Sequence, residues 1–121
     1  MKHAELTEKI IGACYRVYAT LGSGFLEKVY ENALKIELER LGLAVVQQSA
    51  ISVLYEGQQV GEFFADLLVG DAVIVELKAA EALATIHEVQ LVNYMKATKI
   101  EVGLLVNFGP KIEIRRKANT L

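Results

Sequence analysis

Two neighbouring apolar segments, residues 63–69 and 73–78, each contain one carboxylate. Asp66 interrupts the first segment and Glu76 the second, and Lys78 follows two residues after Glu76. Segments rich in Val, Ile, Leu and Phe that are separated by a Gly-Asp pair are typical of adjacent strands. A carboxylate buried in a sheet costs several kcal/mol unless something compensates it. The fold must therefore bring hydrogen bonds, a cation or a metal ion to these two side chains.

The connection between the two segments decides whether the carboxylates meet. A two-residue turn at Gly70-Asp71 would pair Asp66 with Val75, because paired residues share a face of the sheet. Glu76 would then face away. We therefore predict a three-residue connection or a glycine-centred bulge near Gly70, which places Asp66 opposite Glu76 or Ile74 with Lys78 on the same face.

Hydrophobic periodicity predicts the remaining elements. Steps of three and four residues indicate two helices that end at glycine-containing segments, and alternating or continuous apolar runs indicate strands. Thr85 and Glu88 match a capping box and predict the start of a third helix. The expected order is ααβββαββ, with helices at 6–21, 25–41 and 86–99 and strands at 43–55, 60–69, 72–79, 102–108 and 112–114. Without a linker or repeat, residues 1–121 are expected to form a single domain.

Composition excludes several classes of protein. The chain is 53% hydrophobic and 23% charged, which is typical of a folded domain, and no apolar run reaches the roughly 18 to 20 residues of a membrane span. The charged N-terminus does not resemble a secretion signal, so we expect a cytoplasmic protein. Cys14 lies in the apolar pattern of the first helix and is expected to be a buried structural thiol. The high apolar fraction in so short a chain also favours a dimer.

The net charge of −2 limits non-specific binding to nucleic acid, which depends on Lys and Arg contacting phosphates. Any such binding must be local. Arg115, Arg116 and Lys117, with Lys111 before them, are either a phosphate-binding edge or simply a solvated edge.

Two helices carry further polar candidates. Glu27 follows a glycine-rich turn and shares a helix face with Tyr30, although a first-turn acid stabilised by the helix dipole is an equal alternative. His87, Gln90 and Tyr94 form a polar stripe on the third helix. We expect His87 to be a first-turn or exposed residue rather than a metal ligand. For Glu76 and Lys78, the alternative is a solvent-facing ion pair.

From about Leu21 to the C-terminus, the chain resembles the GxxExxY protein family of the PD-(D/E)XK nuclease superfamily. The naming motif runs from Gly24 through Glu27 to Tyr30, and the strand motifs are Ala65-Asp66 and Glu76-Leu77-Lys78. The segment from Gln90 to Tyr94 is similar to the QxxxY motif of the RecB-type branch. Ala65 stands where the superfamily's naming proline would be. The resemblance implies an α/β fold with a restriction-endonuclease-like core: a central mixed sheet flanked by helices, to which the first helix and last strand are additions.

The resemblance also implies a site. Asp66 and Glu76 would bind Mg²⁺ or Mn²⁺, with Glu27 and the Leu77 carbonyl as further ligands, and oxygen ligands of this kind select these ions over zinc. The metal would acidify a water molecule and stabilise charge on the scissile phosphate. Asp66, Glu76 and Lys78 would be catalytic, with Lys78 orienting the water or the transition state. The substrate-binding residues would be Gln90, Tyr94 and Tyr30.

The implied function is a nuclease that hydrolyses phosphodiester bonds of DNA or RNA. The alternative is a catalytically inactive nuclease-fold module for binding or assembly, which would also cover a purely structural interaction domain. Because the chain is not basic, nucleic acid is expected to bind weakly to it alone, so a homodimer or a partner protein is expected to assist. No membrane partner is expected.

Overall fold

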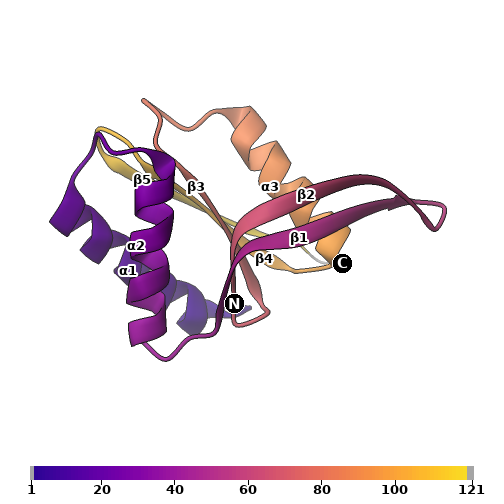
Figure 1. Cartoon of the computed structure of the whole chain (residues 1–121), viewed down its shortest axis with the longest axis horizontal. Coiled ribbons are helices and arrows are strands. Elements are labelled where there is room, and N and C mark those ends of the chain that lie inside the picture. Colours follow the sequence, from indigo (N-terminus) through magenta and orange to yellow (C-terminus); the bar gives the residue numbers. More distant parts are fainter. Residues whose placement is uncertain (1, 120–121) are drawn as a thin grey trace.

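The elements follow the predicted order ααβββαββ in the computed structural model, which describes residues 2–119 (Figure 1). Most ends lie within about two residues of the predicted ones, but the last strand runs four residues further than expected. The helices and strands are α1 (Ala4–Leu21), α2 (Glu27–Arg40), β1 (Val45–Tyr55), β2 (Gln58–Val69), β3 (Val73–Lys78), α3 (Thr85–Thr98), β4 (Val102–Phe108) and β5 (Ile112–Ala118).

The strands form one sheet in the order β1-β2-β3-β4-β5. Only β3 and β4 run parallel, because α3 connects them as a crossover, and the other neighbours are antiparallel. Helices α1 and α2 cover one face and α3 covers the other (Figure 1). Every residue of β4 is buried, as expected for a strand covered on both faces. The predicted mixed sheet flanked by helices is confirmed.

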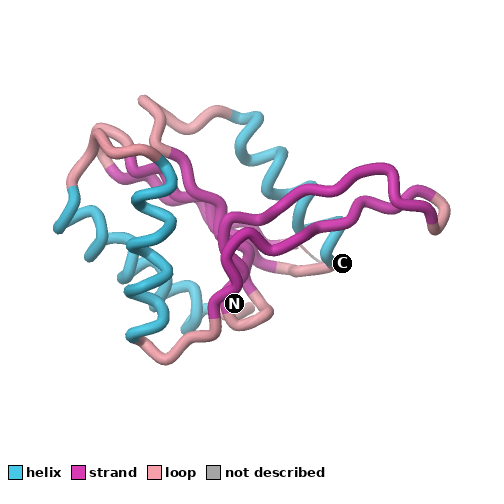
Figure 2. Tube along the Cα trace, in the orientation of Figure 1, coloured by secondary structure: helices cyan, strands magenta, loops and turns pink. Residues whose placement is uncertain are grey.

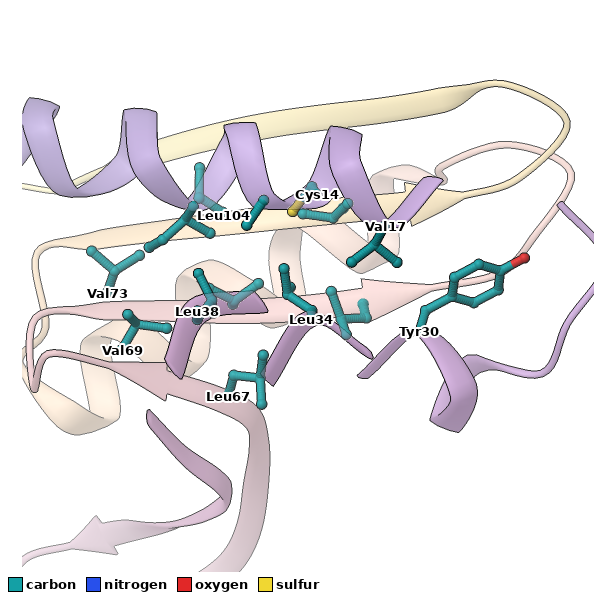
Figure 3. Close-up of a cluster of buried hydrophobic side chains, with 14 of the residues drawn as sticks. Cys14, Val17, Tyr30, Leu34, Leu38, Leu67, Val69, Val73 and Leu104 are labelled. Atoms are coloured by element: carbon teal, nitrogen blue, oxygen red, sulfur yellow. The ribbon is translucent and has the colours of Figure 1, made fainter. Parts of the chain in front are cut away.

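The larger core lies between the sheet and helices α1 and α2 (Figure 3). Cys14 lies inside it with no exposed surface, and burial raises the pKa of its thiol to about 12. A thiol that remains protonated is a poor nucleophile and a poor metal ligand. The structural role predicted for Cys14 is confirmed.

Strands β1 and β2 extend beyond the body of the molecule as a two-stranded hairpin (Figure 2). We call residues 50–64 the arm. It closes through Glu56 and Gly57, which both have positive φ (50° and 81°), as a two-residue hairpin turn of the I′ kind requires. In contrast, β2 pairs with β3 only at Leu67, Leu68 and Val69. The arm therefore leaves the sheet just beyond Asp66.

The start of α3 differs from the prediction. Thr85 is already the first helical residue, and Ala84, which has no side-chain acceptor, occupies the capping position. His87 Nδ1 accepts a hydrogen bond from the Ala84 N–H at 3.1 Å, while Glu88 pairs with Lys117 at 2.7 Å. The predicted capping box is wrong, because the first-turn histidine takes the place that a glutamate usually fills.

No helix among residues 2–119 is both long and apolar enough to span a bilayer.

Candidate active site

The connection between β2 and β3 contains three residues, Gly70 to Ala72. It pairs Val69 with Val73 and Leu67 with Val75. Gly70 and Asp71 both have positive φ, at 59° and 53°. When this register is continued by one residue, Asp66 lies opposite Glu76, as predicted.

At this position the two carboxylates replace the backbone hydrogen bonds of the sheet. The Asp66 N–H donates to Glu76 Oε2 at 2.7 Å, and the Leu77 N–H donates to Asp66 Oδ2 at 2.8 Å. Each side chain is thus fixed by the opposite strand. The two acidic groups lie side by side where β2 leaves the sheet.

Burial makes this pair costly to ionise. Glu76 is 6% exposed, and its burial, followed by the negative charge of Asp66, raises its pKa to about 8. The pKa of Asp66 is also raised, mainly by burial, although the bond from the Leu77 N–H opposes the change. The positive charge of Lys78 lowers the pKa of both groups and is too weak to restore their usual values.

Glu27 and Lys78 lie near the pair. Glu27 is the exposed first residue of α2, and its pKa is raised by partial desolvation. Lys78 lowers the pKa of Glu27 and Asp66 raises it, so these charges lie within electrostatic range of one another. Lys78 is half-buried at the end of β3, in register with Asn107 of β4.

Asn107 was not singled out in the sequence, although it is fully buried. Its side-chain amide accepts a hydrogen bond from the Ala80 N–H at 2.9 Å and donates to the Ala80 C=O at 3.0 Å. This pair of bonds holds the chain as it leaves Lys78. A single polar residue inside an otherwise apolar strand was the available signal.

Tyr30 does not lie where the sequence prediction placed it. It is fully buried, it stacks on Phe108 with ring centroids 4.6 Å apart, and its hydroxyl donates to the Gly22 C=O at 2.6 Å. The hydroxyl also accepts from the Phe25 N–H at 3.2 Å. Tyr30 therefore holds the turn that precedes Glu27, and the expected contact with substrate does not fit its burial.

A buried acid that the sequence analysis passed over lies one turn along from Glu27. Glu31 is 4% exposed and receives hydrogen bonds from Lys28 at 2.9 Å, from Gln47 and from Gln48 at 3.2 Å. Its position on the same helix face as Leu34 was the signal that could have found it.

Gln48 links this acid to the carboxylate pair. Its neighbours on β1 pair with Leu67 and Ala65, so Gln48 lies opposite Asp66, and its amide also donates to Asp66 Oδ1 at 3.4 Å. Its φ of 53° is uncommon for a residue other than glycine. Strained backbone of this kind occurs often at functional sites.

Gln90 and Tyr94 meet one turn apart on α3. Gln90 Nε2 donates to the Tyr94 hydroxyl at 2.8 Å, and the Tyr94 ring packs on Phe63 of the arm with centroids 5.7 Å apart. Burial raises the pKa of Tyr94, and the charges of Glu76 and Asp66 raise it further. Tyr94 thus contacts the arm and lies within electrostatic range of the carboxylates.

The basic C-terminal strand is largely paired within the chain. Arg115 pairs with Glu113 at 3.5 Å and Lys117 with Glu88 at 2.7 Å, while Arg116 donates to the Lys2 carbonyl. These bonds favour the solvated-edge alternative over a phosphate-binding edge.

The donor set fits a hard divalent cation. Each carboxylate has one oxygen held by a backbone N–H. The other two oxygens, Glu76 Oε1 and Asp66 Oδ1, are the candidate ligands, and Asp66 Oδ1 also accepts the 3.4 Å bond from Gln48. The Leu77 C=O points to the same strand edge as its N–H, toward Asp66. Among residues 2–119, however, no three His, Cys, Asp or Glu side chains form a ready-made metal cage. All-oxygen donors suit Mg²⁺ or Mn²⁺ rather than zinc.

Comparisons with known proteins give one family and one fold. A family model described as the PD-(D/E)XK nuclease superfamily matches residues 4–117. A solved structure titled "Crystal structure of SSO0001" is 19% identical, with a TM-score of 0.59. That match covers 98% of this chain and 61% of the other one, so this chain spans less than two thirds of that protein's length. No curated protein matches.

Proposed function

Because the chain belongs to the PD-(D/E)XK nuclease superfamily, we propose that it is a metal-dependent nuclease that hydrolyses phosphodiester bonds of DNA or RNA. Nucleases of this superfamily typically use divalent metal ions. Within the superfamily, we assign the chain to the GxxExxY family on its motif of Gly24, Glu27 and Tyr30. We treat residues 1–121 as one domain.

The observation that carries this proposal is the Asp66–Glu76 pair. Two carboxylates fixed by opposite strands, Asp66 half-buried and Glu76 buried with its pKa raised to about 8, would repel each other when ionised. A divalent cation between them would remove that repulsion and restore both charges. The fold therefore holds a costly arrangement that a metal ion would make favourable.

The side chains around the pair have separate proposed roles. Asp66, Glu76 and the Leu77 carbonyl would hold Mg²⁺ or Mn²⁺, with Glu27 as a further acid from α2. The bound ion would supply positive charge to the scissile phosphate and would acidify a water molecule. Lys78 would donate a hydrogen bond to a phosphate oxygen and stabilise the charge that develops on it in the transition state. Gln90 and Tyr94 would contact the substrate.

A second candidate function is an inactive binding module with the same fold. The absence of a three-carboxylate cage among residues 2–119 and the paired state of the C-terminal cations favour it. The four groups Glu27, Asp66, Glu76 and Lys78 favour the nuclease, because a module without catalysis has no need for acids with raised pKa values in its sheet.

Calorimetry and cleavage assays together test the proposal. Asp66→Asn keeps an oxygen for the Leu77 N–H but removes the charge, so we expect Mn²⁺ binding and cleavage both to be lost. Asp71→Asn in the exposed β2–β3 turn is the matched control and should retain both. Equal Mn²⁺ binding by Asp66→Asn and the parent would show that the site is wrongly assigned.

A substitution of Lys78 tests cleavage separately from metal binding. Lys78→Ala should retain Mn²⁺ binding and lose cleavage, because its proposed role belongs to the transition state. The substrates should include single-stranded, double-stranded and branched DNA and RNA, each with Mg²⁺ and with Mn²⁺. If the parent protein binds Mn²⁺ and cleaves none of them, the inactive-module function is favoured.

A further inference from the structure

A groove of about 820 Å³ lies between the arm and α3. Figure 1 shows α3 passing behind the arm where β1 and β2 leave the body, and α3 is in contact with β1. The arm contributes Val53, Leu54 and Phe63 to one wall, and α3 contributes Val89, Asn93 and Tyr94 to the other. This volume lies within the range of sites that bury small ligands.

The groove begins close to the candidate active site, because Phe63 in its wall lies three residues before Asp66 on β2, about 10 Å along the strand. The ring of Tyr94 packs on Phe63 in the groove, and the charges of Glu76 and Asp66 contribute to the raised pKa of its hydroxyl. Gln90, which also lines the groove, is hydrogen-bonded to that hydroxyl. A strand with a phosphate at the carboxylates could therefore continue directly into the groove.

The chemistry of the walls indicates which part of a strand fits there. Lys96 is the only charged residue among the described residues that line the groove. Binding of a duplex relies mainly on phosphates that contact Lys and Arg, so one lysine suits it poorly. In contrast, exposed aromatic and apolar surface suits the faces of unpaired bases, which stack on aromatic side chains with little preference for sequence. Phe63 is 46% exposed and offers such a surface.

We propose that this groove binds unpaired bases of a single DNA strand, stacked on Phe63, next to the phosphate that the carboxylates act on. Asn93 and Gln90 supply amide groups for the edges of the bases. The sugar is deoxyribose, because Val53 and Leu54 offer no polar side chain to a 2′-hydroxyl, and the Ser52 hydroxyl beside them already donates to Gln59 at 3.3 Å. This inference rests on the proposed nuclease function and deepens it by naming the substrate.

The test measures binding without cleavage. Fluorescence anisotropy in EDTA compares a labelled single-stranded DNA 12-mer with the same sequence as a duplex and as single-stranded RNA. We expect the single-stranded DNA to bind at least about tenfold more tightly than either. We also expect a shallow salt dependence, with a slope of log K against log salt of about −1 to −2, because few phosphates are contacted. A duplex that binds equally well, or a steeper slope typical of backbone binding, would overturn the proposal. RNA that binds equally well would overturn the choice of DNA.

Two adjacent phenylalanines give a matched pair of variants. Phe63 lines the groove, whereas Phe64 is 48% exposed and projects from the opposite face of the same strand. Phe63→Ala should weaken the affinity for single-stranded DNA by about 5- to 100-fold, as expected when a base loses its aromatic partner. Phe64→Ala should leave the affinity unchanged, and Phe63→Tyr should retain it. Equal effects of the two alanine variants would contradict the assignment.

The outcomes separate this inference from the nuclease proposal. Metal-stimulated cleavage in a protein whose DNA affinity is unaffected by Phe63→Ala would retain the nuclease and overturn the groove. DNA binding that depends on Phe63, in a protein that cleaves no substrate, would retain the groove and overturn the nuclease. If Phe63→Ala changes the molar mass measured by light scattering and leaves DNA affinity unaltered, the groove belongs to a second copy of the chain, and the proposal fails.

Discussion

Glu76 holds one end of the β2–β3 pairing and one end of the candidate metal site. Its Oε2 atom accepts a hydrogen bond from the Asp66 N–H, a bond that a backbone carbonyl would accept in a regular sheet. The same side chain remains a titratable acid. Asp66 does the same for the Leu77 N–H. At the scale of residues, the charge state of the site and the integrity of the sheet are therefore linked.

This linkage predicts the pH dependence of stability. In the metal-free protein, folded Glu76 keeps its proton until about pH 8, whereas an unfolded glutamate releases it near its usual value of 4.5. The folded state thus binds more protons between these values, and the free energy of unfolding should fall as pH rises from about 5 to 8. One such group contributes a slope of at most about 1.4 kcal/mol per pH unit.

Urea unfolding from pH 5 to 8 measures this slope in the parent and in Glu76→Gln. The variant keeps an oxygen for the Asp66 N–H and has no proton to lose, so its slope should be smaller. Saturating Mn²⁺ should also reduce the slope of the parent. Identical slopes for the two metal-free proteins would show that Glu76 is not the group responsible.

Gln48 provides a second prediction at this scale. The hydrogen bonds of its side-chain amide stabilise the fold, whereas its positive φ destabilises it. Gln48→Ala and Gln48→Gly both remove the bonds to Glu31 and Asp66, but glycine adopts a φ of 53° without strain. The glycine variant should therefore be more stable than the alanine variant by about 0.5 to 1 kcal/mol in urea unfolding. If the alanine variant were the more stable, the backbone at Gln48 would not be strained.

The sequence predicted some of these residues and not others, for physical reasons. Asp66 and Glu76 could be recognised because an acid inside an apolar strand is costly wherever it lies. Gln48 could not, because a strand glutamine is usually solvated and a positive φ leaves no mark in the sequence. Glu31 left one sign, its place on the same helix face as the apolar Leu34. Tyr30 was assigned to the substrate because a motif shows which residues occur together and does not show which of them are buried.

At the scale of elements, the turn from Gly22 to Leu26 determines where α2 begins and hence where Glu27 lies. The Tyr30 hydroxyl joins both sides of that turn, and its ring is clamped on Phe108 of β4. Gly24 has a φ of 107°, which only glycine adopts readily. The three motif residues are thus a turn residue, an acid and the anchor that positions it.

Tyr30→Phe should therefore reduce both stability and metal affinity. Loss of the hydroxyl leaves the Gly22 C=O and the Phe25 N–H without that partner, at a cost of about 1 to 2 kcal/mol in unfolding free energy. Tyr18→Phe is the matched control, because the Tyr18 hydroxyl donates to the Gly109 carbonyl at 2.7 Å in a different turn. Only the Tyr30 variant should weaken Mn²⁺ binding in calorimetry. Equal Mn²⁺ affinities for the two variants would show that the turn held by Tyr30 does not position the metal site.

Elements were the most predictable level of the structure, because periodicity depends on burial of whole faces. The three-residue connection followed from one requirement, that Asp66 and Glu76 share a face. The first and last residues of the helices and strands were less predictable. The start of α3 depends on whether His87 or Glu88 reaches back to the backbone, and the competing partner of Glu88, Lys117, comes from a strand almost thirty residues away.

At the scale of the whole molecule, the arm exposes apolar surface that the body does not cover. Tyr55 and Val60 are each more than 60% exposed near its tip. A two-stranded hairpin with little core of its own is only marginally stable in water. We propose that the tips of two arms pack together in a homodimer, in keeping with the apolar composition of the chain.

Light scattering at micromolar concentration should therefore give about twice the 13.3 kDa of one chain. Val60→Lys should shift the protein toward the monomer, because it places a charge in the proposed interface. Thr20→Lys adds the same charge at an exposed position of α1, in the body of the molecule, and should leave the dimer intact. A 13 kDa species for the parent protein would rule out the dimer.

The way the arm leaves the sheet makes its length independent of the chemistry at its base. Asp66 is held by Glu76 and Leu77, whereas everything beyond it on β2 pairs with β1 alone. Two residues inserted on each side of Glu56 and Gly57 would lengthen the arm by about 7 Å and keep every side chain on its present face. Related chains could therefore evolve a longer or shorter reach along a strand through paired insertions at this tip, without moving a single atom of the carboxylate pair.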